Sequence, residues 1–324
     1  MHKMVFAILI ALTLNFNSSI MKSENNANET PVTTKLSTEV TSEKVTFMND
    51  EYSLKIVGIV FRPKNVAPTE KLPAIVVNGP MGSIKEQTQS LYASKLAALG
   101  YTTITFDYTT FGESEGEPRR YENPDRKASD IKAAVTYLQS RPDVIADRIA
   151  GVGICGSGSY MAHATVQDPR IKLLVSIVPF TVMDTFMIKP LEEAIKDRLA
   201  YEAGTEGPQY INMMPEGEIG APYYYDDSRG HIPGWNPNVV SWSEESWVDF
   251  KPTEEIKQLK VPYLVITSEN AFTRDMATQM FNNAGVTNKG LYTVGLASHF
   301  NMYDQDPYVR VAIEQIALFL RDNF

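Results

Sequence analysis

Five short apolar segments of this chain alternate with segments of helical periodicity, and this alternation constrains its fold more than any other feature. The apolar segments are residues 73–78, 101–107, 149–154, 171–178 and 261–267. Runs of this kind suit strands that are buried on both faces. The segments of helical periodicity are residues 86–99, 127–138, 157–166, 273–281 and 308–319. This order predicts an α/β fold with a mostly parallel central sheet and helices on both faces.

The only cysteine of the chain, Cys155, follows the third of these apolar runs. A reactive residue on a strained strand-to-helix turn needs small residues two positions before and after it, because larger side chains would collide with the tight backbone. Gly153 and Ser157 occupy these two positions. The N–H groups and the dipole of a helix N-terminus stabilise a thiolate, so we expect Cys155 to be a nucleophile with a lowered pKa.

Two other interpretations of this segment stay open. A lone cysteine is most often a small buried hydrophobic residue without chemistry. Ser157 is a rival nucleophile, because Cys155 and Ser159 flank it at the same spacing. The apolar run ends at Ile154, however, which would put Ser157 inside the first helical turn.

Residues 78–87, 106–120, 153–158 and 297–304 carry a family resemblance. They are similar to the dienelactone-hydrolase-related α/β hydrolases, a group that includes polyketide transferases and thiohydrolases. The resemblance runs from Thr46 to the C-terminus and implies an α/β-hydrolase fold with a nucleophile at Cys155, a histidine at His299, and acyl transfer or hydrolysis. The chain departs from the family pattern at Ala271, where an aspartate is usual, and at Ser159, where a glycine is frequent.

The position of His299 supports a catalytic role. The α/β hydrolases present nucleophile, acid and histidine in that chain order. Of the four histidines, only His299 follows the last predicted strand, residues 290–295, and precedes the final helix. We therefore expect His299 to be the general base, against the alternative of a loop histidine that only forms local hydrogen bonds.

The acid of the predicted triad is harder to assign. Glu269 is the nearest carboxylate to the alanine that replaces the usual aspartate, so we expect it to orient the histidine. Asn270 is an alternative as a neutral partner. Asp275 and Asp184 are further alternatives, the first at the start of a helix and the second beyond the preceding strand.

The oxyanion hole requires two backbone donors. One is expected from Gly156, the residue after the nucleophile, and the other from the loop that follows the strand at residues 73–78. Pro80 has no N–H, so Met81 is the expected second donor, and the alternative for this loop is a plain glycine-proline turn.

Residues 185–252 interrupt the alternation and are expected to form a cap insertion. Aromatic side chains are dense there, at residues 223–225, 235, 242 and 247. We expect Trp235 and Tyr224 to line a pocket for the acyl or aryl part of a substrate. The alternative is that these aromatic residues fill a small satellite core.

The N-terminus predicts export. Residues 1–20 combine a short basic head, an apolar run and a small polar tail, as in a secretory signal peptide. Residues 21–44 are too polar to order themselves and are expected to form a disordered linker before a domain at 45–324. The apolar run is short for a transmembrane helix, and no cysteine follows it for lipid attachment. We expect an extracytoplasmic protein, periplasmic or secreted, without a membrane anchor after cleavage.

The net charge of −9 argues against a nucleic-acid partner. A small-molecule acyl ester or thioester is the expected substrate, with neither a cofactor nor a metal ion. The chain is thus predicted to be an esterase or thioesterase, or an acyltransferase, that forms a cysteine acyl-enzyme. Two competing hypotheses are a catalytically degenerate binding protein with a hydrolase fold and a redox-responsive thiol.

Overall fold

An eight-stranded sheet forms the centre of the fold in this computed structural model, which describes residues 40–182, 188–217 and 221–324. The strand order is β1-β2-β4-β3-β5-β6-β9-β10. The strands are β1 Val40–Asn49, β2 Leu54–Pro63, β3 Leu72–Asn78, β4 Thr102–Phe106, β5 Val144–Ile154, β6 Ile171–Ile177, β9 Tyr263–Asn270 and β10 Lys289–Ser298. The pairings β1·β2 and β2·β4 are antiparallel, whereas every pairing from β4 to β10 is parallel.

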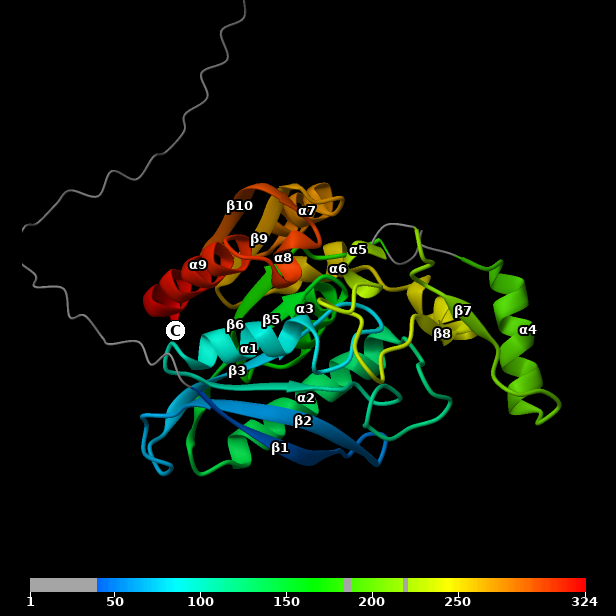
Figure 1. Cartoon of the computed structure of the whole chain (residues 1–324), viewed down its shortest axis with the longest axis horizontal. Coiled ribbons are helices and arrows are strands. Elements are labelled where there is room, and N and C mark those ends of the chain that lie inside the picture. Colours follow the sequence, from blue (N-terminus) through cyan, green and yellow to red (C-terminus); the bar gives the residue numbers. More distant parts are fainter. Residues whose placement is uncertain (1–39, 183–187, 218–220) are drawn as a thin grey trace, which may run out of the picture. The chain divides into compact units, whose positions relative to one another are not determined.

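Helices cover both faces of this sheet (Figure 1). Helices α1 Thr88–Ala97 and α9 Tyr308–Asn323 pack against each other on one face, next to the short helix α8 Asn301–Asp304. Helices α2 Pro124–Ser140, α3 Gly156–Gln167 and α7 Arg274–Asn283 lie on the other. All five residues of β4 are buried, as expected for a strand covered on both sides. The predicted α/β-hydrolase fold is confirmed.

Strand β1 begins at Val40, so the expected linker boundary at residue 44 was wrong. The strand is at the edge of the sheet, where its ten residues pair in an antiparallel ladder with β2. Its first half is mostly exposed and polar, and it is held by backbone hydrogen bonds and little by burial. The polar composition of residues 40–44 therefore looked like that of a linker, although these residues form an edge strand. Residues 1–39, which include the expected signal peptide, lie outside the described residues.

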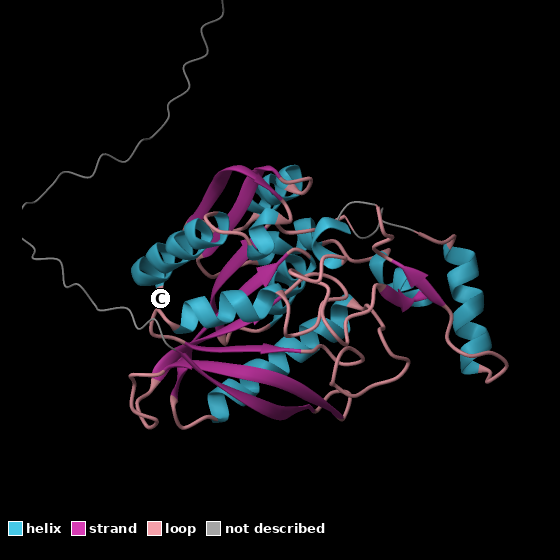
Figure 2. Ribbon diagram, viewed as in Figure 1, coloured by secondary structure: helices cyan, strands magenta, loops and turns pink. Residues whose placement is uncertain are grey.

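The segment between β6 and β9 forms an insertion, as the irregular aromatic-rich sequence predicted (Figure 2). We call residues 188–217 and 221–251 the cap. It contains α4 Leu191–Glu202, β7 Tyr210–Asn212, α5 Ala221–Tyr224, β8 Asn238–Val240 and the 3-10 helix η2 Ser241–Trp247. Strands β7 and β8 form a separate antiparallel pair. The short helices α6 Pro252–Glu255 and η3 Ile256–Gln258 then lead back to β9.

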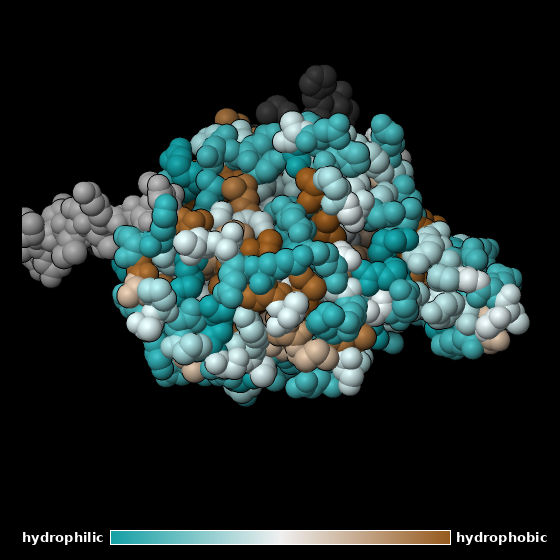
Figure 3. Space-filling view, turned by 60° about the horizontal axis from the view of Figure 1, so that its bottom comes forward, coloured by the Kyte–Doolittle hydropathy of each residue, from teal (hydrophilic) through white to brown (hydrophobic). Residues whose placement is uncertain are grey.

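Two cap tryptophans have packing roles: Trp247 belongs to the main hydrophobic core, and Trp242 packs within the cap. Trp242 and Trp247 are both buried, and the ring of Trp242 lies 5.2 Å from that of Tyr201 on α4. No helix in the described part of the chain has the length and apolar character needed to cross a membrane. On the face shown in Figure 3, hydrophobic residues form patches interspersed with hydrophilic ones.

Candidate active site

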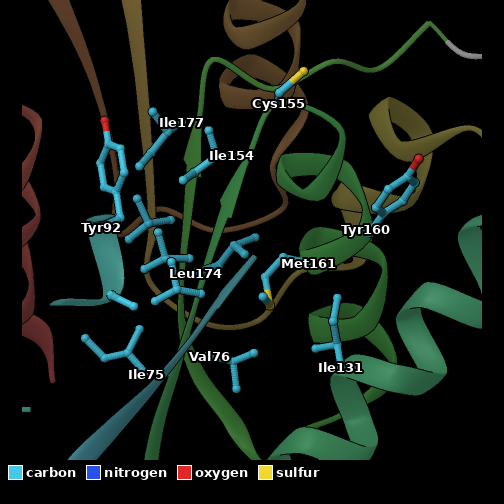
Figure 4. Close-up of a cluster of buried hydrophobic side chains, with 14 of the residues drawn as sticks. Ile75, Val76, Tyr92, Ile131, Ile154, Cys155, Tyr160, Met161, Leu174 and Ile177 are labelled. Atoms are coloured by element: carbon cyan, nitrogen blue, oxygen red, sulfur yellow. The ribbon is translucent and has the colours of Figure 1, made fainter. Parts of the chain in front are cut away.

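Cys155 stands at the apex of a sharp turn between β5 and α3 (Figure 4). Its φ of 55° is a strained conformation for a residue other than glycine. The glycines on either side make the turn possible, since a Cβ on Gly153 would collide with the backbone of Ser157, and one on Gly156 would lie 2.6 Å from Cγ of Met81. The Cys155 N–H donates to the carbonyl of Ile177 on β6 at 2.9 Å. The predicted strand-to-helix turn is therefore present.

The thiol of Cys155 is 5% exposed, and its burial raises its pKa to about 11. The expectation of a lowered pKa was thus wrong, because desolvation outweighs the groups that favour the thiolate. Those groups are the hydroxyl of Tyr303 and the backbone N–H groups of Gly156 and Met81, which all interact with the sulfur. The two amides expected to form an oxyanion hole thus lie together at the sulfur of Cys155.

Glu122, a residue that the sequence analysis missed, supports the loop that carries Met81. Its Oε2 accepts a hydrogen bond from the N–H of Gly82 at 3.1 Å. Its Oε1 accepts from the hydroxyl of Tyr160 at 2.6 Å and from Nζ of Lys127 at 2.5 Å. The side chains of Glu122, Lys127 and Tyr160 are all buried. The buried ion pair between Glu122 and Lys127 therefore supports the loop that contains Gly82.

The backbone of Glu122 also contacts the cap. Its N–H donates to Oγ of Ser243 at 3.0 Å, and its carbonyl accepts from Nε1 of Trp247 at 2.9 Å. One residue thus contacts both the cap and the loop at residues 79–84, which carries Met81 and which we call the oxyanion loop. No sequence pattern indicated this role, because the partners of Glu122 lie 5, 38, 40, 121 and 125 positions away.

His299 lies between β10 and α8, as predicted, but its partners differ from the expected ones. Nδ1 lies 3.0 Å from Oγ1 of Thr273, and Nε2 lies 3.0 Å from the hydroxyl of Tyr303. Among the described residues, no hydrogen bond joins His299 directly to Cys155, because the Tyr303 hydroxyl contacts both. The imidazole is 1% exposed, and burial lowers its pKa to about 3.

The assignment of Glu269 as the triad acid was wrong. Strand β9 continues to Asn270 and does not end at residue 267, so Glu269 stays in the strand and its exposed carboxylate accepts a hydrogen bond from the N–H of Leu296 at 3.0 Å. The Asn270 amide donates to the Leu296 carbonyl. Asp275 is exposed in the first turn of α7. Asp184 lies outside the described residues.

The hydroxyl of Thr273 makes the contact with Nδ1 of His299 that the carboxylate of a triad acid would make. It donates to the carbonyl of Val178 at 3.2 Å, so it accepts the hydrogen on Nδ1 of His299. Nε2 is then unprotonated and accepts the hydrogen of the Tyr303 hydroxyl. The hydroxyl oxygen of Tyr303 remains able to accept the hydrogen of the Cys155 thiol. The four side chains thus form one chain of hydrogen-bond donors and acceptors that ends at the Val178 carbonyl.

Ser157, the rival nucleophile, lies inside the first turn of α3. Its Oγ is 2.8 Å from the hydroxyl of Tyr108, and its side chain is fully buried. In the cap, Tyr224 is buried and its ring stacks on that of Trp235 at 5.0 Å. Burial raises the pKa of Tyr224, and Cys155 and Tyr303 are among the groups that act on it. Of the two cap aromatics expected to bind substrate, Tyr224 thus lies near the sulfur, and Trp235 stacks on Tyr224.

No group of three or more His, Cys, Asp or Glu side chains in the described part of the chain is arranged to hold a metal ion. The chemistry available at the site is that of a thiol, an imidazole, a phenol and two backbone amides. This set can transfer a proton from sulfur and stabilise a negative charge on a carbonyl oxygen.

Comparison with known proteins gives a consistent result. A family model described as X-Pro dipeptidyl-peptidase (S15 family) matches residues 53–188. The chain is 30% identical over 316 residues to the uncharacterized protein PA2218 of Pseudomonas aeruginosa, covering 89% of this chain and 82% of that protein. It is 32% identical over 198 residues to the thiohydrolase apmlB of Arthrinium phaeospermum, covering 58% of this chain and 61% of the other.

Solved structures show the same fold. The crystal structure of PA2218 superposes with a TM-score of 0.79 and covers 89% of this chain and 95% of the other. The α/β hydrolase GrgF from Penicillium superposes with a TM-score of 0.76 at 20% identity, covering 87% of this chain and 99% of GrgF.

Proposed function

The chain belongs to the α/β hydrolases, in the group that includes the fungal thiohydrolases, and from this we propose that it cleaves or transfers the acyl group of a small ester or thioester through a cysteine acyl-enzyme. The observation that carries this proposal is the arrangement at Cys155. A thiol at the apex of a strained turn faces the backbone N–H groups of Gly156 and Met81. Two such donors are what a tetrahedral oxyanion requires.

The hydrogen-bond chain supports a mechanism for the first step. The proton of the Cys155 thiol moves to the hydroxyl oxygen of Tyr303 while the Tyr303 proton moves to Nε2 of His299. The sulfur attacks the carbonyl carbon, and the carbonyl oxygen takes up negative charge against the amides of Gly156 and Met81. The leaving alcohol or thiol then takes the proton back by the reverse path, which leaves the acyl group on sulfur.

A second half-reaction releases the acyl group. Water, or another acceptor in a transferase, loses its proton along the same path as it attacks the acyl-enzyme carbonyl. Collapse of the tetrahedral intermediate breaks the carbon–sulfur bond and returns a proton to the sulfur. While Cys155 and His299 are buried as in this structure, a thiolate–imidazolium pair is not stable, because the pKa of Cys155 is raised to about 11 and that of His299 is lowered to about 3. Proton transfer therefore accompanies formation of the bond to the substrate.

We assign the selection of the acyl group to the cap. Cys155 is too buried for a substrate to reach it in this conformation, so the cap must move for substrate to enter. Tyr224 and Trp235 are stacked next to the site, and their aromatic faces suit an apolar acyl or aryl group.

Hydrolysis of matched para-nitrophenyl esters and acyl thioesters tests the proposal, with Cys155→Ala as the inactive form and Ser157→Ala as the control. We expect turnover by the wild type and by Ser157→Ala, none by Cys155→Ala, and a mass increase equal to the acyl group on the Cys155 peptide. Full activity of Cys155→Ala would refute the cysteine mechanism. Loss of activity in Ser157→Ala alone would transfer the nucleophile to Ser157. Absence of turnover by every form would favour the alternative of a binding protein.

We further propose that the chain is exported with residues 1–20 as its signal peptide. The basic head and apolar run of the sequence support this. Expression of the full chain with a C-terminal tag, followed by fractionation and N-terminal mass spectrometry, tests it. A mature N-terminus near residue 21 in the extracytoplasmic fraction is expected, and an intact Met1 in the cytoplasm would contradict the proposal.

A further inference from the structure

A small polar pocket lies beside the oxyanion loop, between that loop and the cap. Its volume is about 140 Å³. Its lining includes two residues of the oxyanion loop, two adjacent arginines and two cap residues, which are Gly82, Ile84, Arg119, Arg120, Gly234 and Asn236. Two guanidinium groups thus lie at one cavity.

Neither guanidinium has a carboxylate partner among the described residues. Nε of Arg120 donates to the carbonyl of Asn238 at 2.8 Å, and its guanidinium lies 4.4 Å from the centre of the Tyr210 ring. Arg119 donates to the carbonyls of Ser114 at 2.5 Å and Gly112 at 2.7 Å. These contacts fix both side chains without an ion pair, although the carboxylates of Glu117 and Asp107 act on Arg119 from beyond ion-pair distance.

Several other partly buried arginines of this chain form ion pairs. Arg62 and Arg141 both form ion pairs with Asp143, and Arg229 pairs with Asp304. Burial lowers the pKa of Arg119, and the charge of Arg120 acts in the same direction, against the opposing charge of Glu117. Two neighbouring arginines at one pocket, neither of them in an ion pair, form a site that an anion would complete.

The position of the pocket connects it to the reaction. Gly82 lines the pocket and directly follows Met81, whose N–H faces the sulfur of Cys155. A group in the pocket and a carbonyl in the oxyanion hole would therefore contact neighbouring residues of one loop. A ligand that extends from one to the other would be a single small molecule with an acyl group and an anionic group.

We propose that this pocket binds a carboxylate of the substrate, and that Arg120 is the residue that recognises it. The terminal N–H groups of Arg120 form a planar fork that matches a carboxylate in a bidentate arrangement. Arg119 adds positive charge and holds the loop from Gly112 to Gly116 in place. This inference rests on the proposed acyl-transfer function and names its substrate class, which is esters or thioesters that carry a second, anionic carboxyl group.

Matched substrates test the proposal. The acyl arm compares para-nitrophenyl hemiglutarate with para-nitrophenyl valerate, which differ by a carboxylate at the end of the acyl group. The leaving-group arm compares para-carboxyphenyl valerate with phenyl valerate. We expect one of the two anionic substrates to have a KM about ten-fold to 100-fold below that of its neutral partner, since a charged hydrogen-bonded pair has an effect of that order. The arm that responds shows which side of the scissile bond carries the carboxylate.

Arg120→Gln should remove this preference and leave the neutral substrates unchanged, and Arg120→Lys should restore part of it. Arg310→Gln, which makes the same charge change on the exposed face of α9, is the matched control and should behave as wild type. The melting temperature gives a readout that is independent of turnover. We expect added glutarate to raise the melting temperature of wild type and of Cys155→Ala, and to leave that of Arg120→Gln unchanged.

Two outcomes would overturn the carboxylate pocket, and a third would overturn only the catalytic proposal. If wild type cleaves the valerate esters without any preference for charge, the acyl-transfer function stands and the carboxylate pocket does not. An equal rise in KM of Arg120→Gln for charged and neutral substrates would mean that Arg120 only supports the fold. If no ester is cleaved but glutarate raises the melting temperature through Arg120, the pocket stands and the catalytic proposal fails.

Discussion

The two halves of the candidate active site differ in how their residues are distributed along the chain. The nucleophile half consists of Cys155 and its flanking glycines, which are contiguous in the chain, together with Met81 from one loop. The base half gathers His299, Tyr303 and Thr273 from two separate segments. The first half matches the expected pattern, whereas the second has a hydroxyl where a carboxylate is usual and a phenol between base and nucleophile. A turn that depends on backbone geometry tolerates few substitutions, but a hydrogen-bond chain accepts any residue that supplies the right donors and acceptors.

The largest expected effect follows from removing the base. His299→Ala should lower turnover of an activated ester by about two to four orders of magnitude, which is the range for a positioned general base. The measurement is kcat with saturating substrate for the purified variants. Turnover within a factor of two of wild type would mean that the base half is not catalytic and that the nucleophile half acts alone.

The next effect concerns the reactivity of the thiol. The rise in the pKa of Cys155 from 9.0 to about 11 reduces the thiolate fraction at neutral pH by about 100-fold. Iodoacetamide should therefore label Cys155 in the folded protein at least that much more slowly than in the same protein unfolded in urea. The labelling rate should rise with pH up to the raised pKa. Rapid labelling at neutral pH would show that the cap opens often and that the closed state is a minor one.

Tyr303→Phe should reduce kcat about ten-fold to 100-fold and leave KM nearly unchanged, because the proton path loses its middle member. A solvent deuterium isotope effect distinguishes this from a structural defect. A curved proton inventory, expected for two protons in motion, should become linear in the variant. Tyr137→Phe on α2, which removes a hydroxyl that bonds Arg141, is the control and should retain both turnover and curvature.

Thr273→Val should have a smaller effect, a loss of up to about ten-fold in kcat, because it removes a neutral hydrogen bond and leaves Nδ1 of His299 without its acceptor. Thr273→Ser should restore activity. If kcat is the same for wild type, Thr273→Val and Thr273→Ser, the orientation of His299 depends on its packing alone.

The smallest expected change is with pH. The base acts in its unprotonated form, and the pKa of His299 lowered to about 3 keeps it unprotonated throughout the range from pH 5 to 7. kcat/KM should therefore stay nearly constant across this range, whereas a histidine with its usual pKa would cause a fall of about 20-fold to 30-fold at pH 5. An acid limb near pH 6.5 would show that the productive state exposes His299 to water.

The sequence predicted most of the fold because its central strands are distinct apolar runs. The strand β1 was missed because an edge strand is held by backbone pairing and its exposed half resembles a linker. Cys155 and His299 were identified from local pattern and chain order. Thr273 could not be identified in this way, because its role depends on where β9 ends and on the carbonyl of Val178. Val178 has a φ of 40° and lies directly after β6.

Tyr303 could have been found from its spacing. It follows His299 by four residues, and two residues at this spacing lie on one face of a helical turn. It also belongs to residues 297–304, a segment that carried the family resemblance. The pattern included the tyrosine without indicating that its hydroxyl would separate the base from the nucleophile.

The position of Glu122 limits how caps can be exchanged between relatives. Its carboxylate holds Gly82 next to the oxyanion donor, while its backbone holds Ser243 and Trp247 of the cap. A chimera that receives a foreign cap therefore needs a hydroxyl and an indole at equivalent points to keep residue 122 in place. Without them, a change made to alter substrate choice would also displace the loop that we propose as the oxyanion hole. Under that proposal, selectivity and rate in this scaffold are not independent design variables.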